Sequence, residues 1–279
     1  MAKKSFKVLF YTTKFGSDGL CLRDCGSVLV KSLKSHHLPK VEFDENNYQI
    51  RDLVISEFEW RGVFGRLRPD APNEVDVNDY ESKLTLKPKS FLIEKVHFIY
   101  KPKHDILIWQ INTDVGFTGK FEFYLLRILT DNLFVYAIPR GSSLDKVLSG
   151  EVKYYEVKVA MPKTKISKVP KYEQQTFDLM KGVGGATINY KISALNGILN
   201  GNIYDRIRSI LSSDSTKSLK VKLAEDDEPI DLFIDRISDR MSVNLIGHYP
   251  DPNDIFNRLN YAFDRNKSDL MDGVKKYDT

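Results

Sequence analysis

Cysteine, tryptophan and long apolar runs are scarce in this sequence of 279 residues. The two cysteines, Cys21 and Cys25, are too few for a disulfide framework, and their spacing is not the Cys-x-x-Cys pair of a zinc site. We expect two reduced thiols near the start of a helix. No segment approaches the ~18–20 apolar residues of a membrane span, and Met1–Phe6 lacks the apolar stretch of a signal peptide. These absences make the cytoplasm the expected compartment.

Catalytic motifs are absent as well. The sequence has no Gly-x-Ser-x-Gly elbow, no His-Glu-x-x-His motif, no Walker A loop and no Rossmann fingerprint. Gly116–Lys120 has the wrong spacing for a phosphate loop, and Gly182–Gly185 precedes a predicted strand instead of the helix N-terminus that holds phosphate. We interpret both as turns. The five histidines are scattered without a cysteine or carboxylate cluster, so we predict no metal, no cofactor and no enzyme activity.

The residues that are abundant indicate a globular protein with much β-structure. Hydrophobic residues make up 42% of the chain, and the 16 Phe and 14 Tyr favour a core of strands, on whose pleated surface aromatic rings pack well. The formal net charge is +4 and the pI is near 8.8. This mild excess of basic residues is compatible with a nucleic-acid partner but does not require one, because solvated lysines give the same figure.

The hydrophobic pattern predicts short strands joined by short connectors, with helices interspersed irregularly. The clearest signal is an antiparallel hairpin over 91–112, against which we expect the helix at 116–131 to pack. Residues 69–80 are predicted as a loop, and 219–246 as a meander of three strands. The fold class is therefore α+β with mainly antiparallel sheets and a long C-terminal helix. The predicted strands are 7–12, 48–56, 57–68, 133–138, 152–161 and 187–193, and the other predicted helices are 24–35, 143–148, 172–181, 202–212 and 253–276.

A basic segment interrupts this pattern at 162–170, where a proline stands at each end and no acidic residue occurs. Such segments are typical of linkers between domains. We therefore predict two sub-domains: an N-terminal α+β domain over 1–161 and a C-terminal α+β domain over 172–279, joined by a basic linker or mobile loop over 162–171.

One degenerate pattern resembles that of metal-dependent nucleases. Pro69-Asp70 is followed, after an interval, by Glu81-Ser82-Lys83. In such a site Asp70 and Glu81 would bind Mg²⁺ and Lys83 would orient water. Here Asp70 stands in a proline-rich segment and Glu81 and Lys83 begin only a short strand-like run. A solvated loop is therefore the preferred interpretation, and a nuclease is kept as an alternative.

Lysine and arginine gather in three places. The first is 81–103, with six lysines against two glutamates, the second is the linker, and the third is the strand that ends at Arg68. Basic, mobile loops suit non-specific duplex binding, in which affinity comes from phosphate neutralisation. The alternative is a lysine-rich sheet edge that prevents aggregation. The expected phosphate contacts are Lys163, Lys165, Lys168, Lys171, Arg66, Arg68, Lys87 and Lys89.

The layout as a whole carries a family resemblance. It comprises an opening strand with Phe10-Tyr11-Thr12, the central segment Ser90–Glu94, an aromatic-rich helix ending in Phe123-Tyr124-Leu125, and a lysine-rich connection to a second mixed unit. In these features the chain resembles the RexA-like phage exclusion proteins and related uncharacterised prophage proteins. The resemblance implies a two-part α+β fold, a homodimer, and DNA binding without strong sequence preference in phage exclusion or antiviral defence. It implies no active site.

The leading hypothesis from the sequence is thus a homodimeric, non-enzymatic protein that binds double-stranded DNA through its phosphate backbone. A second hypothesis is an interaction module that binds another protein through an aromatic-rich surface, with its basic residues only solvating the chain. The third is the Mg²⁺-dependent nuclease described above.

Overall fold

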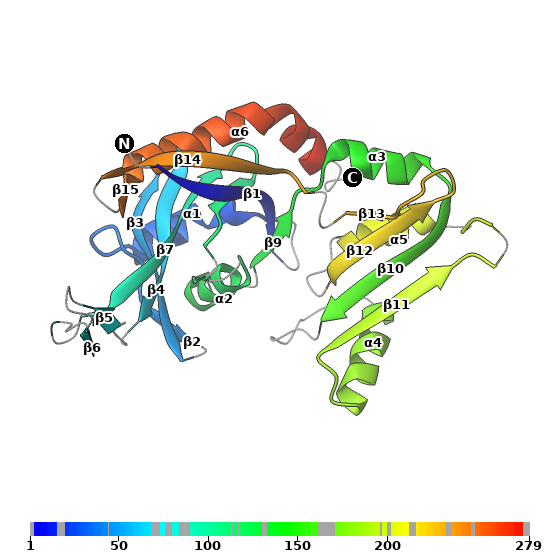
Figure 1. Ribbon diagram of the computed structural model, residues 1–279, viewed down its shortest axis with the longest axis horizontal. Coiled ribbons are helices and arrows are strands. Elements are labelled where there is room, and N and C mark those ends of the chain that lie inside the picture. Colours follow the sequence, from blue (N-terminus) through cyan, green and yellow to red (C-terminus); the bar gives the residue numbers. More distant parts are fainter. Residues whose placement is uncertain are drawn as a thin grey trace.

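The computed structural model arranges the chain in two large antiparallel sheets and a small two-stranded one (Figure 1). The expected α+β class is confirmed, as is the long C-terminal helix, α6 (Pro252–Lys275). The structure describes residues 3–15, 20–43, 45–68, 73–75, 80–83, 87, 90–112, 114–115, 118–129, 133–160, 171–195, 197–199, 202–211, 216–232, 236–246 and 249–275.

The larger sheet has nine strands in the order β15–β14–β1–β8–β7–β4–β3–β2, and β9 pairs with the second half of β1. The hairpin predicted over 91–112 is confirmed as β7 and β8. The bounds of the nine strands are β1 Lys3–Phe15, β2 Val41–Phe43, β3 Asn46–Ile55, β4 Trp60–Arg68, β7 Leu92–Lys101, β8 Ile106–Gln110, β9 Leu133–Ala137, β14 Ser238–Ile246 and β15 Tyr249–Pro250.

The central strands of this sheet are buried on both faces, which explains their continuous apolar runs. Along β1, Leu9 belongs to one core and Val8 and Phe10 to another, because successive side chains of a strand point to opposite faces. The same alternation divides β8, where Trp109 lies in the first core and Ile108 in the second.

Helix α2 (Thr118–Leu129) fills the first core, and the sheet curls partly around it (Figure 1). The Phe121 ring packs edge-on against Phe64 and Trp109, with centroids 5.5 and 5.2 Å away, and also contacts Phe98 of the hairpin. The expected packing of this helix on the hairpin is therefore confirmed. The short η1 (Leu22–Cys25) and α1 (Gly26–Ser32) lie at the same core through Leu22 and Leu29.

Helix α6 covers the opposite face of the nine-stranded sheet. Its buried residues Ile255, Leu259 and Phe263 recur at helical spacing and pack on side chains such as Phe10 and Ile99. A helix on each face thus encloses the central strands from both sides.

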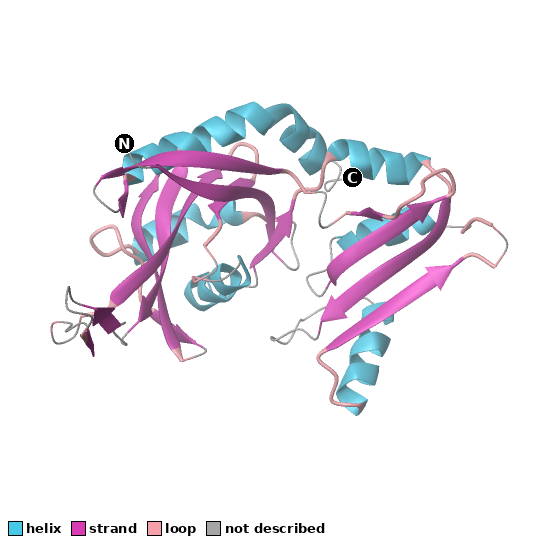
Figure 2. Cartoon of the chain, in the orientation of Figure 1, coloured by secondary structure: helices cyan, strands magenta, loops and turns pink. Residues whose placement is uncertain are grey.

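The second sheet has four strands in the order β11–β10–β12–β13. Its helices lie on one side, with α4 and α5 behind the strands in the view of Figure 2. They bury a core of their own that includes Val157, Phe177, Ile207 and Leu219. The bounds are β10 Val152–Ala160, β11 Thr187–Ser193, β12 Thr216–Leu223, β13 Ile230–Asp231, α3 Gly141–Ser149, α4 Lys171–Gly182 and α5 Ile203–Leu211.

The chain path corrects two expectations. Strand β10 belongs to the second sheet, so the boundary expected at 162–171 falls inside the second unit. Strand β14 leaves the predicted meander over 219–246 and pairs instead with β1, because its buried side chains complete the core beneath α6. The second unit, roughly 141–232, is therefore inserted into the first, which consists of both ends of the chain. The entry and exit points meet where Ile237 N–H donates to the Ile138 carbonyl at 3.0 Å.

A smaller difference concerns the segment 69–80, which was expected to be a loop. Asn73–Val75 forms strand β5 and pairs with β6 (Glu81–Lys83) in a two-stranded sheet. A strand of three residues has no room for a periodic pattern, so the sequence did not indicate β5. Strand β6 overlaps the short strand-like run that begins at Glu81 and Lys83.

Candidate functional site

The outer face of the second sheet is the most distinctive surface of the described structure. Side chains alternate along β10, so Tyr155, Val157 and Val159 enter the core while Tyr154, Glu156 and Lys158 point away from the helices. No described helix covers this side, and the strands stand in front of the helices in Figure 2.

Strand pairing gathers lysines on this outer face. Residues that lie opposite each other in an antiparallel pair share a face of the sheet. Glu156 lies opposite Lys191 of β11 and Lys220 of β12, so these two lysines flank Glu156 on the outer face. Lys222 faces Tyr154 in the same way. We call the outward residues Tyr154, Glu156, Lys158, Lys191, Lys220 and Lys222 the basic face.

Lysines dominate the charge of the basic face. Glu156 lies within it, and Asp231 lies beside it on β13, opposite Lys220. Lys158 and Lys191 are exposed, whereas Lys220 and Lys222 are half-buried. Same-face residues of one strand are about 7 Å apart and neighbouring strands about 5 Å apart, so these ammonium groups are spread over a surface instead of a single point.

Two contacts organise the face. The Lys191 ammonium lies 3.6 Å from the centroid of the Tyr154 ring, a cation–π contact that keeps an aromatic ring beside a positive charge. Lys222 donates to the backbone carbonyl of Asp226, while the Asp226 carboxylate pairs with Lys146 of α3. The turn after β12 thereby holds Lys222 at one end of the face.

Most of the expected linker contacts lie outside the described residues. These are Lys163, Lys165 and Lys168, and the side chain of Lys171, the first residue of α4, also lies outside them. The segment joins β10 to α4, both of which belong to the second unit. It therefore begins on the strand that carries Lys158.

Arg66 and Arg68, the two arginines expected to contact phosphates, form ion pairs within the first unit. Arg68 Nη1 lies 2.6 Å from Glu94 Oε1, and Arg66 Nη1 lies 3.5 Å from Glu94 Oε2. Arg66 also donates to the Asn46 side chain at 2.8 Å and to the Asp114 carbonyl at 3.2 Å. These contacts tie β3, β4 and β7 together and engage both guanidinium groups. Figure 1 places β4 and β10 in different lobes.

Lys87 is exposed, and its carbonyl accepts the Ser90 N–H at 2.9 Å. Lys89 lies outside the described residues. Lys87 lies between β6 and β7 in the chain, and β7 belongs to the nine-stranded sheet of the first unit.

The nuclease pattern is only partly described. Asp70 lies outside the described residues, and Glu81 and Lys83 stand at the two ends of β6, opposite Val75 and Asn73. Among the described residues, no group of three histidine, cysteine or acidic side chains is arranged to hold a metal ion. A solvated loop stays the preferred interpretation, and the nuclease with Asp70, Glu81 and Lys83 stays an alternative.

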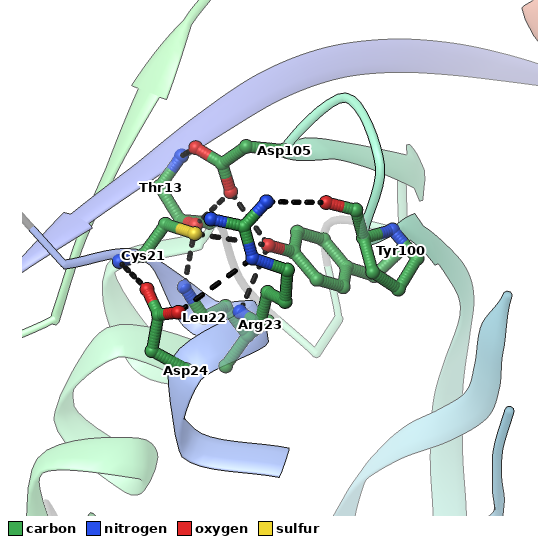
Figure 3. A network of polar contacts seen from close by, with 8 residues as sticks. Thr13, Cys21, Leu22, Arg23, Asp24, Tyr100 and Asp105 are labelled. Carbon is green, nitrogen blue, oxygen red and sulfur yellow. Dashed lines mark hydrogen bonds and ion pairs between the residues drawn. The ribbon is translucent and has the colours of Figure 1, made fainter. Parts of the chain in front are cut away.

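A buried polar network in the first unit is the other concentration of chemically reactive groups (Figure 3). The Asp105 carboxylate accepts hydrogen bonds from the Thr12 hydroxyl at 2.7 Å, from the Thr13 N–H at 3.0 Å and from the Thr13 hydroxyl. Tyr100 donates to the same carboxylate at 2.7 Å and accepts the Arg23 N–H at 2.9 Å. Strand β1, the β7–β8 turn and η1 are thereby joined at one carboxylate.

The burial of this network gives it a structural role. Burial raises the pKa of Asp105, although the Thr13 and Thr12 hydrogen bonds oppose that shift. Burial also raises the pKa of the Cys21 thiol, with the Asp105 charge acting in the same direction. A thiol is nucleophilic only as thiolate, so Cys21 is kept in its unreactive form. Asp105 itself has φ +50°, a left-handed conformation that aspartate tolerates better than most residues.

The sequence did not reveal the basic face. Lys158, Lys191, Lys220 and Lys222 each stand between apolar or neutral neighbours, and they come from three strands that are distant in the chain. The available signal was Lys-x-Lys alternation in 216–223, which places both lysines on the face opposite the core.

Comparison with known protein families gives a match over most of the chain. A family model described as a family of unknown function (DUF6731) matches residues 40–269. No curated protein matches the chain, and among the described residues no helix is long and apolar enough to cross a membrane. The matched segment runs from the end of the α1–β2 connection into α6, and so includes the whole second unit and much of the first. The chain belongs to this family of unknown function, DUF6731.

Proposed function

We propose that this protein binds DNA without sequence preference, through phosphate contacts made by the basic face of the second sheet. The observation that carries the proposal is the gathering of Lys158, Lys191, Lys220 and Lys222 on one sheet face that no described helix covers. Lysine ammonium groups on flexible stems suit backbone contacts, in which each neutralised phosphate releases condensed counterions.

Tyr154 adds a second type of contact. The Lys191 ammonium covers one face of the Tyr154 ring, so a base at a strand end or in an unpaired nucleotide would stack there once Lys191 turns to a phosphate. The ring reads no particular base, because every base has a π-face. Together with the lysines it supports binding without sequence preference.

The linker lysines expected from the sequence extend this proposal. Lys163, Lys165 and Lys168 follow β10 directly, with Lys171 at the start of α4. We propose that they contact phosphates beyond the edge of the basic face. Arg66 and Arg68 have a smaller part in the proposal, because both already pair with the Glu94 carboxylate.

The biological setting is proposed from the resemblance to RexA-like phage exclusion proteins. Binding to DNA regardless of sequence is suited to a protein that responds to any invading genome, and it fits a cytoplasmic role in antiviral defence.

The test is the salt dependence of DNA binding by fluorescence anisotropy with a labelled duplex. The double variant Lys158→Ala/Lys220→Ala is expected to bind more weakly and to lower the slope of log K against log salt by about 2, since each phosphate contact contributes about 0.9. Loss of phage exclusion by the same variant in a plaque assay would support the proposed setting.

The matched control is Lys31→Ala/Lys103→Ala, which removes the same charge from exposed positions of the first unit. It is expected to leave the slope nearly unchanged. Equal slopes for the two double variants would overturn the basic face as the site. Absence of binding at low salt would overturn the proposal and favour the protein-interaction alternative, whereas cleavage of the duplex with Mg²⁺ would favour the nuclease.

A further inference from the structure

The edge strand β11 is unlike the other edges of the two large sheets. The terminal strands β2, β13 and β15 have two or three residues each, which is a common way of protecting a sheet edge. Strand β9 also has one unpaired side, but there the Glu122 carboxylate accepts the Val135 N–H at 2.7 Å. Strand β11 has seven residues, Thr187–Ser193, and no described strand pairs with its outer side.

The sequence of β11 contains only one of the features that usually block edge pairing, a single lysine. It has no proline, its pairing with β10 has an unbroken register, and Lys191 is its only charged residue. Ile192 lies on the core side of the sheet, opposite Tyr155, yet it is 41% exposed. An apolar side chain that faces the core but remains this exposed indicates that the core side of the sheet is incomplete at this edge.

The direction of the unused backbone groups follows from one hydrogen bond. Ala194 N–H donates to the Lys153 carbonyl at 2.9 Å, toward β10. Backbone groups alternate in direction along an antiparallel strand, so those of Thr187, Asn189, Lys191 and Ser193 point to the open side. Their side chains are the ones on the outer face of the sheet.

We infer that two copies of the chain pair antiparallel through β11. With Tyr190 opposite Tyr190 of the second copy, Thr187 pairs with Ser193 and Asn189 with Lys191, so that all four outward-pointing residues form hydrogen-bonded pairs. Ile192 then lies against Ile188 of the second copy on the core side. A shift of two residues in one direction would place Lys191 opposite itself, and like charges directly opposite are destabilising. A shift of two residues in the other direction would leave the outward-pointing groups of Ser193 without a partner in β11 of the second copy.

This pairing joins two four-stranded sheets into one of eight strands and brings the two basic faces together on the same side. Only this last consequence, a continuous DNA-binding surface, rests on the proposed function. A single edge of seven residues makes a small interface, and small interfaces are typical of transient complexes. The dimer is therefore expected to depend on concentration.

Sedimentation of the full chain, free of nucleic acid, tests the inference. The mass is expected to rise from 32.1 kDa toward twice that value over a concentration series reaching about 1 mM. Asn189→Pro removes an N–H that points to the open side, a position at which an edge strand tolerates proline, and is expected to abolish the rise. The matched control Asn189→Ala keeps the N–H and is expected to dimerise.

Cross-linking reports the register. In the inferred dimer Tyr190 of one copy and Tyr190 of the other form a non-hydrogen-bonded pair. Their Cα atoms are expected to lie about 4.5 Å apart, which is within the range of a disulfide. Tyr190→Cys is expected to give a covalent dimer on oxidation. Glu156→Cys, one strand further in, is expected to give none, and the unsubstituted chain provides the background from its two native thiols.

A chain that stays monomeric throughout the series, or that cross-links equally through both variants, overturns the inference. The two proposals fail separately. A monomer that binds DNA would overturn the dimer alone, and a dimer that does not bind DNA would overturn the proposed function alone.

Discussion

His97 lies beneath α6, where the residue is only 3% exposed and its ring packs edge-on against Phe256 at a centroid distance of 5.4 Å. Nδ1 is 2.8 Å from Gln110 Oε1, which also accepts the His97 N–H, so Nδ1 carries the proton. Nε2 has no hydrogen-bond partner among the described residues. Burial, with a smaller contribution from Lys95, lowers the pKa of His97 to about 4.

This shift predicts a loss of stability in mild acid. The unfolded chain takes up a proton near pH 6.5 but the folded chain does so only near pH 4, so the unfolded state binds more protons between these values. The His97 contribution is complete above pH 6.5 and falls by about 3 kcal/mol by pH 4. Urea unfolding of the chain and of His97→Gln across this range measures it. His97→Gln is expected to lose less free energy of unfolding than the unsubstituted chain between pH 6.5 and pH 4. An equal loss in both proteins would contradict the assignment of this pH dependence to His97.

At the scale of elements, the close approach of α6 to the connection between β9 and α3 depends on Gly273. A Cβ atom built there would lie 2.5 Å from Ile138 Cγ2 and 3.0 Å from the Pro139 carbonyl oxygen. The helix therefore touches the point at which the chain passes from the first unit into the second. Only a residue without a side chain allows this contact.

Gly273→Ala is accordingly expected to lower the free energy of unfolding by about 1–3 kcal/mol, the usual cost of overpacking a filled site. Thermal or urea unfolding measures the change. Gly182→Ala is the control, because Gly182 also lies in a helix but its Cβ would have no neighbour within 4 Å. An equal loss in both variants would show that the close approach at Gly273 has no special role.

At the scale of the whole molecule, the second unit is an insertion whose two ends are joined by a β-bridge between Pro139 and Arg236. We predict that replacing 141–232 by a short Gly-Ser linker leaves the first unit folded, since its sheet, α2 and α6 all remain. A chain ending at 161 is expected not to fold, because it lacks β14 and α6, which cover Val8, Phe10 and Ile99. Near-UV circular dichroism and amide dispersion distinguish the two. The opposite outcome would restore the boundary at 162–171.

Local patterns determined most of the elements of this protein. Strict alternation predicted 187–193 as a strand, the two apolar runs around a proline-containing connector predicted the β7–β8 hairpin, and helical spacing predicted α2 and α6. These signals are local because a side chain's face is set by the period of its own helix or strand. The absence of catalytic motifs and the α+β class followed from the same local information.

The tertiary structure alone decided which strands pair. The patterns of β12 and β14 are equally strand-like, yet β12 joins β10 and β14 joins β1, 237 residues away at Ser5↔Ser242. Partner choice depends on which apolar faces together close a core, and no single segment contains that information. For the same reason the sequence could not show that four lysines share one face, namely Lys158, Lys191, Lys220 and Lys222. Alternation along each strand turns each lysine outward, but only the pairing of three distant strands brings the four together.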